Sequence, residues 1–303
     1  MGATASGKTS LALDLAHRLD PSGECIVADS MQIYRGMNIG TASPTALEQS
    51  QVPHHLLDIV EPGNDGFTVA NFAELANAAI DDIRARGRTP IIVGGTHLYI
   101  RALLEGVFEG PKGDPTLRAE LAEQSVDQLR VELETCDPLA AETIHPNDRR
   151  RTVRAIEVFR LTGKPISSHQ QEWAESITPR IDAMIVGLDW EAEPLNRRIN
   201  ERVREMMQQG FLEEVQRLRE GSIGVQAAEA VGYRELLGVL EQTMSLETAI
   251  ERIKIRSRRY AKQQRTWLRR FKVVPQSLWL EAQGQSAEEL GRQAADWICA
   301  ELH

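Results

Sequence analysis

The sequence predicts an α/β fold, a phosphate-loop (nucleotide-kinase-like) parallel sheet flanked by helices, with an inserted helical subdomain. Residues 2–9, GATASGKT, match the pattern G-x-x-x-x-G-K-[ST] in full. The apolar runs ECIVAD at 24–29 and TPIIVGG at 89–95 are typical of buried parallel strands. Between residues 109 and 175, helical periodicity alternates with Pro and Gly breaks, which indicates helices alone.

The phosphate-loop motif predicts an anion site. Its glycines let successive backbone N–H groups turn inward, Lys8 reaches the terminal phosphates, and the Thr9 hydroxyl ligates the Mg²⁺ that bridges them. The motif does not tell which di- or triphosphate is bound, or whether a P–O or a C–O bond breaks. The residues predicted to bind the phosphates are Gly2, Ala3, Thr4, Ala5, Ser6, Gly7, Lys8 and Thr9.

A phosphate loop ordinarily joins a buried strand to a helix, whose N-terminus faces the anion. Residues 8–19 place Leu11, Leu15 and Leu19 four apart and predict that helix. The strand before Gly2 is not in the sequence, so we expect the first strand to be missing. We also expect this chain to be less stable than one extended upstream, by about 1.5 to 3 kcal/mol per large apolar side chain left uncovered.

Composition indicates an ordinary globular protein. The 303 residues are 42% hydrophobic, enough for a full core. The sequence contains no apolar run long enough to span a membrane and no secretion signal, which favours a cytoplasmic protein without membrane contact. Its three cysteines are far apart and lack metal-ligand spacing, so we expect reduced, structural thiols. A monomer is the expected state, because no long unpaired apolar stripe is evident.

Polar residues at strand ends point to the chemistry. The carboxyl ends of parallel strands meet at one crevice, so Asp29 and Ser30 should face the phosphate loop. The strand at 89–95 ends in Gly-Gly-Thr, without the acid that activates water in ATP-hydrolysing relatives; Asp58 is a weak candidate for that role. Asp29 is therefore a candidate general base toward a nucleophile other than water, or alternatively a cap.

The rest of the chain returns to the α/β pattern after the helical insert. We expect a core of residues 1–108 and 176–303 and an insert of residues 109–175. Within the second part of the core we expect a strand at 182–190, one long helix over 191–219, and a final helix from about residue 287. His54 and His55 are adjacent, so on a strand they point to opposite faces and a structural role is favoured for both.

A basic segment contrasts with the net charge of −9. Residues 254–272 carry nine Lys or Arg, no acid, and three aromatic residues. This pattern is typical of a surface that contacts a nucleic-acid backbone, and the alternative is a solvated helix face. A second basic block at 149–154 favours the first interpretation.

Several segments, in order along nearly the whole chain, resemble the tRNA dimethylallyltransferase family. They are GATASGKT, ADSMQIYRGMNIGTA, PHHLLDIVEP, VGGTHLYIRALLEG, IHPNDRRRTVRAIEV, LNRRINERV, AVGYRELL and RRYAKQQRTWLRRF. The resemblance implies transfer of a dimethylallyl group from dimethylallyl diphosphate to the exocyclic N6 amine of the adenosine 3′ to the tRNA anticodon, position 37. The product would be N6-(dimethylallyl)adenosine.

The resemblance also implies residue roles. Asp29 would take the proton from the adenine amine, Arg202 would contact the diphosphate, and Thr96 would line the channel between the substrates. In this family the loop commonly has proline where this chain has Ala3, which should loosen the turn slightly. The residues that fall on tRNA-contacting segments are Asp29, Ser30, Met31, Gln32, Thr96, Arg118, Arg150, Arg151, Thr152, Val153, Arg154, Val231, Gly232, Tyr233, Arg234, Lys262, Gln264, Arg265, Thr266 and Trp267.

Three alternatives stay open at the level of sequence. A small-molecule or nucleotide kinase shares the phosphate loop, but has no use for the basic segment with its aromatic residues. A prenyltransferase acting on free adenine nucleotides shares the chemistry, but the long insert and the basic segment favour RNA. An RNA-binding protein whose loop is a nucleotide switch would not need Asp29.

Overall fold

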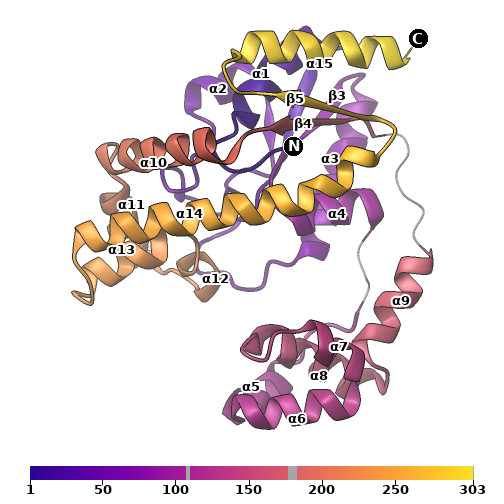
Figure 1. Cartoon of the computed structure of the whole chain (residues 1–303), viewed down its shortest axis with the longest axis vertical. Helices are drawn as coiled ribbons and strands as arrows, with labels where there is room; N and C mark the ends of the chain where they lie inside the picture. Colours follow the sequence, from indigo (N-terminus) through magenta and orange to yellow (C-terminus); the bar gives the residue numbers. More distant parts are fainter. Residues whose placement is uncertain (107–109, 177–182, 303) are drawn as a thin grey trace. The chain divides into compact units, whose positions relative to one another are not determined.

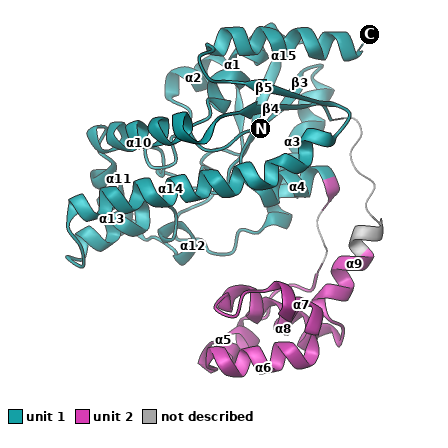
Figure 2. Cartoon of the chain, in the orientation of Figure 1, with its two compact units in different colours: residues 1–104, 180–303 teal, residues 105–179 magenta. Residues whose placement is uncertain are grey.

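The computed structural model describes residues 1–106, 110–176 and 183–302. The chain forms two compact units (Figure 2), residues 1–104 with 180–303, and residues 105–179. Each boundary of the first unit lies four residues from the predicted boundary: it is at residue 104 where 108 was predicted, and at residue 180 where 176 was predicted.

The first unit contains a three-stranded parallel sheet in the order β2-β1-β3. Its strands are β1 (Gly23–Ala28), β2 (His54–His55) and β3 (Thr89–Gly94). Cys25 is paired with His54 on one side and with Ile91 on the other. The central strand β1 is buried along its whole length, because helices cover both faces of the sheet. The helices that begin after the phosphate loop and beside these strands are α1 (Lys8–Arg18), α3 (Val69–Ala85) and α4 (His97–Glu105).

A second, two-stranded parallel sheet pairs β4 (Ile185–Asp189) with β5 (Ser277–Glu281). Sequence reasoning missed β5, because SLWLE is short and lies between a basic helix and a polar loop. The backbone of Met1 continues this sheet: its amino group donates to the Val186 carbonyl, and its carbonyl accepts from the Leu188 amide at 2.9 Å.

An apolar cavity of about 340 Å³ is lined by both β3 and β4. The side chains of Ile91, Ile92 and Val93 line it from β3, and Leu11 and Leu15 line it from α1. Ile92 is 37% exposed, although it belongs to the middle of a strand. The edge of β3 that does not pair with β1 is thus uncovered by another strand among the described residues.

Most of the other helices of the first unit pack against one another, and the C-terminal helix packs against α1 and β5 (Figure 1). The predicted single helix over 191–219 is wrong: it divides at Gly210, which adopts a φ of 93°. Glycine reaches this left-handed conformation without steric strain, so it both ends one helix and begins the next. These helices are α2 (Ala46–Gln51), α10 (Ala192–Gln208), α11 (Phe211–Gly221), α12 (Val225–Ala228), α13 (Tyr233–Leu240), α14 (Leu246–Leu268), the 3₁₀ helix η1 (Arg269–Val273) and α15 (Ala287–Leu302).

The second unit is helical and has its own apolar core. Leu121, Leu129, Leu133 and Ile156 are almost fully buried in it. Helix starts are capped by Asp114, Ser125, Asp137 and Asp148, whose side chains accept backbone N–H groups that lack partners within the helix. The helices are α5 (Pro115–Glu123), α6 (Val126–Cys136), α7 (Pro138–Thr143), α8 (Arg149–Thr162) and α9 (Ile166–Ser176).

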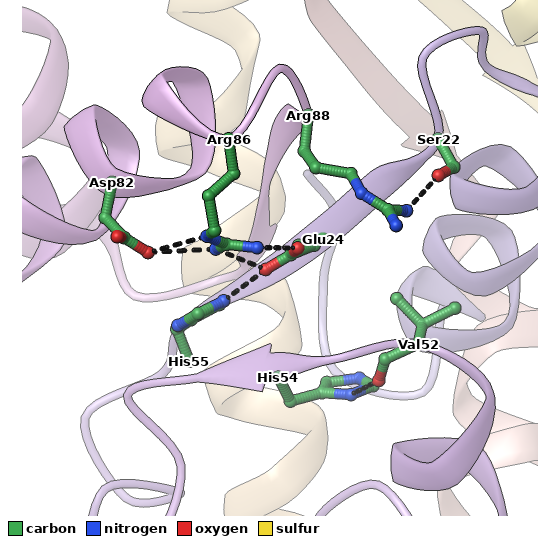
Figure 3. A network of polar contacts seen from close by, with 8 residues as sticks. All are labelled: Ser22, Glu24, Val52, His54, His55, Asp82, Arg86 and Arg88. Atoms are coloured by element: carbon green, nitrogen blue, oxygen red, sulfur yellow. Dashed lines mark hydrogen bonds and ion pairs between the residues drawn. The ribbon is translucent and has the colours of Figure 1, made fainter.

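An ion-pair network around the buried Glu24 side chain joins the amino-terminal part of β1 to α3 and β2 (Figure 3). The Glu24 carboxylate is 3% exposed and accepts two hydrogen bonds from Arg86, which also contacts Asp82. His55 Nε2 lies 2.7 Å from the same carboxylate, whereas His54 Nδ1 contacts the Val52 carbonyl. The two histidines therefore face different partners, and both contacts are structural.

Candidate active site

A cavity of about 810 Å³ lies where the phosphate loop meets the carboxyl ends of β1 and β3. Its lining brings together residues that are far apart in the sequence, as expected for the switch region of a parallel sheet. The charged and polar residues that line it include Lys8, Asp29, Gln32, Arg198, Arg202 and Tyr260.

The phosphate loop has the open backbone that anion binding needs. Ala5 and Gly7 adopt positive φ angles of 60° and 94°, which turn the chain sharply before α1. Gly7 offers no side-chain cap to α1, so the first amides of that helix remain available to an anion. Lys8 Nζ donates to the Ala3 carbonyl at 2.9 Å and thus folds over its own loop.

Side chains from other elements hold the loop from outside. Gln264 of α14, only 2% exposed, accepts the Thr4 amide at 2.7 Å and donates to the Gly95 carbonyl at 2.9 Å. The Arg198 and Trp190 side chains donate to the carbonyls of Ala5 and Ser6, both at 3.1 Å. These contacts anchor the loop through its backbone. The anchoring role of Gln264 is not visible in the sequence, because it depends on where α14 packs.

The charges in the cavity influence one another. Burial lowers the pKa of Lys8 to about 8; Asp29 acts in the opposite direction, and Arg202 lowers it further. Burial also lowers the pKa of Arg202, opposed by the charge of Asp29. The cavity lining contains three cations, Lys8, Arg198 and Arg202, which are suited to pairing with a diphosphate. It also contains the carboxylates of Asp29, Glu48, Glu201 and Glu205.

A hydrogen bond links the segment after β1, which carries Asp29, to the segment after β3, which carries Thr96. The Thr96 hydroxyl accepts the Ser30 amide at 3.0 Å, and one Asp29 oxygen accepts the Met31 amide at 3.0 Å. These bonds fix the direction of the Asp29 carboxylate at the end of β1. Tyr260 of α14 interacts with Thr96 and Gln264, and burial raises its pKa to about 12, so its hydroxyl stays neutral.

The family of the chain follows from comparison with known proteins. The IPP transferase family model matches residues 32–271. The chain belongs to the IPP transferase family. The predicted resemblance, the phosphate-loop type of fold and the assignment as a transferase enzyme are thereby confirmed.

Individual IPP transferase relatives cover most of the chain. It is 45% identical over 290 residues to the tRNA dimethylallyltransferase of Geobacter metallireducens, covering 94% of this chain and 92% of that protein. The tRNA isopentenylpyrophosphate transferase structure from Bacillus halodurans superposes with a TM-score of 0.72 at 38% identity, covering 99% and 94%. A eukaryotic dimethylallyltransferase acting on tRNA gives a TM-score of 0.81 at 30% identity, covering 99% and 78%.

The basic segment of this IPP transferase is partly neutralised by acids from elsewhere. Lys254, Arg256 and Lys272 form ion pairs with Glu251, Glu235 and Asp189, respectively. Arg259, Lys262 and Arg269 are exposed. The run that lacks acids in the sequence therefore offers a smaller cationic surface than its nine charges indicate.

Several residues predicted to contact tRNA are buried, which corrects the expectation for their side chains. Tyr233 donates to Glu214, Gln264 holds the phosphate loop, and Thr152 donates to the Asp148 carbonyl. Gly232 is also buried. Exposed members of the same set are Thr266, Arg234 (paired with Glu229) and Lys262, while Val231, Arg265 and Trp267 are half-buried.

In the helical unit, the predicted RNA contacts divide in the same way. Arg118 and Arg154 both bind the Glu157 carboxylate, which is fully buried, at 2.7 and 2.6 Å. Glu157 thereby organises this unit and has its pKa lowered by the two guanidinium groups against the opposing effect of burial. Arg150 and Arg151 are exposed, and Val153 is half-buried.

The part of the chain that the structure describes lacks two further features. No group of three or more His, Cys, Asp or Glu side chains there is placed to hold a metal ion. No helix among those residues is long and apolar enough to cross a membrane.

Proposed function

We propose that this protein transfers the dimethylallyl group of dimethylallyl diphosphate to the N6 amine of adenosine 37 in tRNA, forming N6-(dimethylallyl)adenosine. The observation that carries the proposal is one cavity lined by the phosphate loop with Lys8, by Arg198 and Arg202, and by the Asp29 carboxylate, in a chain of the IPP transferase family. Relatives named tRNA dimethylallyltransferase support the choice of both substrates.

The proposed reaction breaks the C–O bond between the allyl group and the diphosphate and forms a C–N bond to adenine. The diphosphate leaves with the electron pair, and the amine proton passes to Asp29 as general base. Lys8, Arg202 and the loop amides would stabilise the negative charge on the departing group. This division of labour needs no activated water, in agreement with the Gly94 end of β3.

Magnesium is part of the proposal. Thr9 and Asp29 line the same cavity and supply oxygen atoms, the donors that Mg²⁺ prefers, and phosphate oxygens and water would complete its coordination. When bound, the ion would neutralise charge on the leaving diphosphate. We expect the Thr9 hydroxyl to bind the Mg²⁺ ion.

The anticodon loop is the proposed acceptor site. The target adenine would be extruded from its stack to reach Asp29, since a carboxylate at a strand end cannot enter a stacked loop. The exposed cations of α14, and separately those of α8, would contact phosphates of the tRNA. We place the activity in the cytoplasm and expect a monomer.

The test is incubation of the protein with labelled dimethylallyl diphosphate, Mg²⁺ and unmodified tRNA, followed by mass spectrometry of the nucleosides. Prenylated adenosine is the expected product. Parallel reactions contain ATP with the same tRNA, or AMP as acceptor. Release of γ-phosphate would favour a kinase, and prenylated AMP without tRNA modification would favour a free-nucleotide prenyltransferase. No product from folded protein would contradict the proposal.

A further inference from the structure

One wall of the active-site cavity is a stretch of turns without helix or strand. Residues 38–43 follow β1 by ten residues and line the cavity through Asn38, Ile39, Thr41, Ala42 and Ser43. Such a segment has few backbone partners of its own, so something else must hold it in a single conformation.

The Glu214 carboxylate supplies those partners. It lies in the first turn of α11 and is 2% exposed. One oxygen accepts the amides of Asn38 and Ile39 at 2.9 and 2.7 Å. The other accepts the Gly40 amide at 3.1 Å and the Tyr233 hydroxyl at 2.7 Å. Three successive amides directed at one buried carboxylate form an anion nest, and charge-assisted bonds of this kind are strong.

Packing holds the same turn against the helices. A Cβ atom on Gly40 would lie 2.2 Å from the Phe211 ring and 2.6 Å from the Tyr233 ring, so only glycine fits. Those two rings contact each other edge to face, with centroids 5.0 Å apart. The pKa of Tyr233 is raised well above its ordinary value, by burial first and by the charge of Glu214, so its hydroxyl remains a donor.

The segment of residues 38–43 also fixes a side chain in the cavity. Gln32 Nε2 donates to the carbonyls of Thr41 and Ala42 at 3.1 and 3.2 Å. Gln32 lines the same cavity as Asp29 and follows it by three residues, just after β1. A displaced turn would therefore displace the Gln32 amide.

We propose that Glu214 is a positioning residue for the acceptor side of the active site: it fixes the wall of residues 38–43 and, through it, Gln32. The inference rests on the proposed function for the identity of the acceptor. The phosphate loop is held by Gln264, Arg198 and Trp190 instead. Loss of Glu214 should therefore affect use of tRNA and leave diphosphate binding unchanged.

The test compares Glu214→Gln with Glu213→Gln, an exposed neighbour on the same helix. In Glu214→Gln an amide NH₂ faces backbone N–H donors, so amide hydrogen exchange over residues 36–46 should accelerate about tenfold or more. The kcat/KM for tRNA should fall by about 10- to 100-fold, as for a small misplacement of a reacting group. The Kd for inorganic diphosphate should change less than about twofold, and Glu213→Gln should match the wild type.

Tyr233→Phe provides an independent variant if Glu214→Gln fails to fold. It removes one of the four donors to the Glu214 carboxylate. Amide exchange over residues 36–46 and kcat/KM for tRNA should change in the same directions as in Glu214→Gln, but by less. Two results would overturn the positioning role: unchanged amide exchange over residues 36–46, or a loss of diphosphate affinity as large as the loss in kcat/KM for tRNA. Hydrogen exchange and diphosphate binding need no tRNA turnover, so this inference can fail or hold separately from the proposed reaction.

Discussion

At the scale of single residues, the site depends on carboxylates whose surroundings give them different tasks. Asp29 is half-buried at the end of β1 and carries one amide bond, which leaves an oxygen for a substrate. Glu214 and Glu157 are buried, and both of their oxygens already accept hydrogen bonds. Only the first arrangement suits a general base, because a base needs access to the proton that it removes.

Replacing Asp29 with Ala should therefore slow transfer by about 100-fold or more, while tRNA affinity stays nearly intact. Single-turnover rates with saturating tRNA, beside tRNA titrations, measure the two quantities separately. Asp58→Asn is the matched control, because Asp58 also follows an apolar run but does not line the cavity, and asparagine tolerates its φ of 53°. An unchanged rate in Asp29→Ala would remove Asp29 from the mechanism.

The pKa of Lys8 predicts a pH dependence for diphosphate binding. The pKa of Lys8 is lowered to about 8, so below pH 8 the Lys8 amine of the free protein is mostly protonated. Above that pH a proton must be taken up with the ligand, so affinity should fall by up to about tenfold per pH unit. Calorimetry with inorganic diphosphate from pH 7 to 10 tests this. An affinity that is flat across the range would contradict it.

At the scale of elements, α14 combines two tasks that its sequence presents as one. Its buried side carries Ala261, Gln264 and Leu268, which pack onto the core and the phosphate loop. Its exposed side carries Arg259 and Lys262. The three- and four-residue spacing separates the two sides, so one helix combines an exposed cationic surface with the residues that hold the phosphate loop.

Lys262→Ala should weaken tRNA binding and reduce its salt dependence by about one counterion. Lys254→Ala is the control, because Lys254 is paired with Glu251 and its side chain is 12% exposed. Binding titrations at several salt concentrations give the slope. Equal slopes for wild type and Lys262→Ala would place this residue outside the RNA contact.

The contact of β1 with α3 and β2 predicts acid sensitivity. The pKa of Glu24 is lowered to about 2, first by hydrogen bonds from Arg86 and also by His55. A depressed carboxyl pKa adds stability above the unfolded pKa of about 4.5, and this is lost as pH falls toward 2. At pH 6, urea unfolding should give Glu24→Gln a free energy of unfolding about 1.5 to 3 kcal/mol lower than that of the wild type. This difference should shrink below pH 4. A difference independent of pH would exclude the ion pair as its source.

At the scale of the whole molecule, the division into two units separates tasks. The first unit contains the whole described cavity, and the second has its own core and its own buried anchor, Glu157. The first unit is also where two sheets face an apolar cavity that no described strand fills.

A chain extended before Met1 by about five apolar, strand-forming residues should be more stable, since the segment would pair with β4 and cover the cavity. The melting temperature should rise by about 5 °C or more, from apolar burial at about 25 cal/mol per Å². A Gly-Ser extension of equal length is the control. Equal melting temperatures for the two extended chains would contradict the expectation.

The sequence by itself determined the elements whose signals are local. The phosphate loop, the helix after it and the apolar strands β1 and β3 were predicted close to their observed bounds, and Asp29 was placed at its strand end. Local signals suffice there, because loop amides, helical periodicity and strand burial each depend on neighbours within a few residues.

Only the tertiary structure decided which polar residues are free to act. Gln264 and Tyr233 were predicted to face RNA, yet one holds the phosphate loop and the other supports Glu214. Arg118 and Arg154 share Glu157, from 39 and three residues away. The partner of a charged or polar side chain comes from whichever element packs against it, and a buried group must be paired there before it can do anything else.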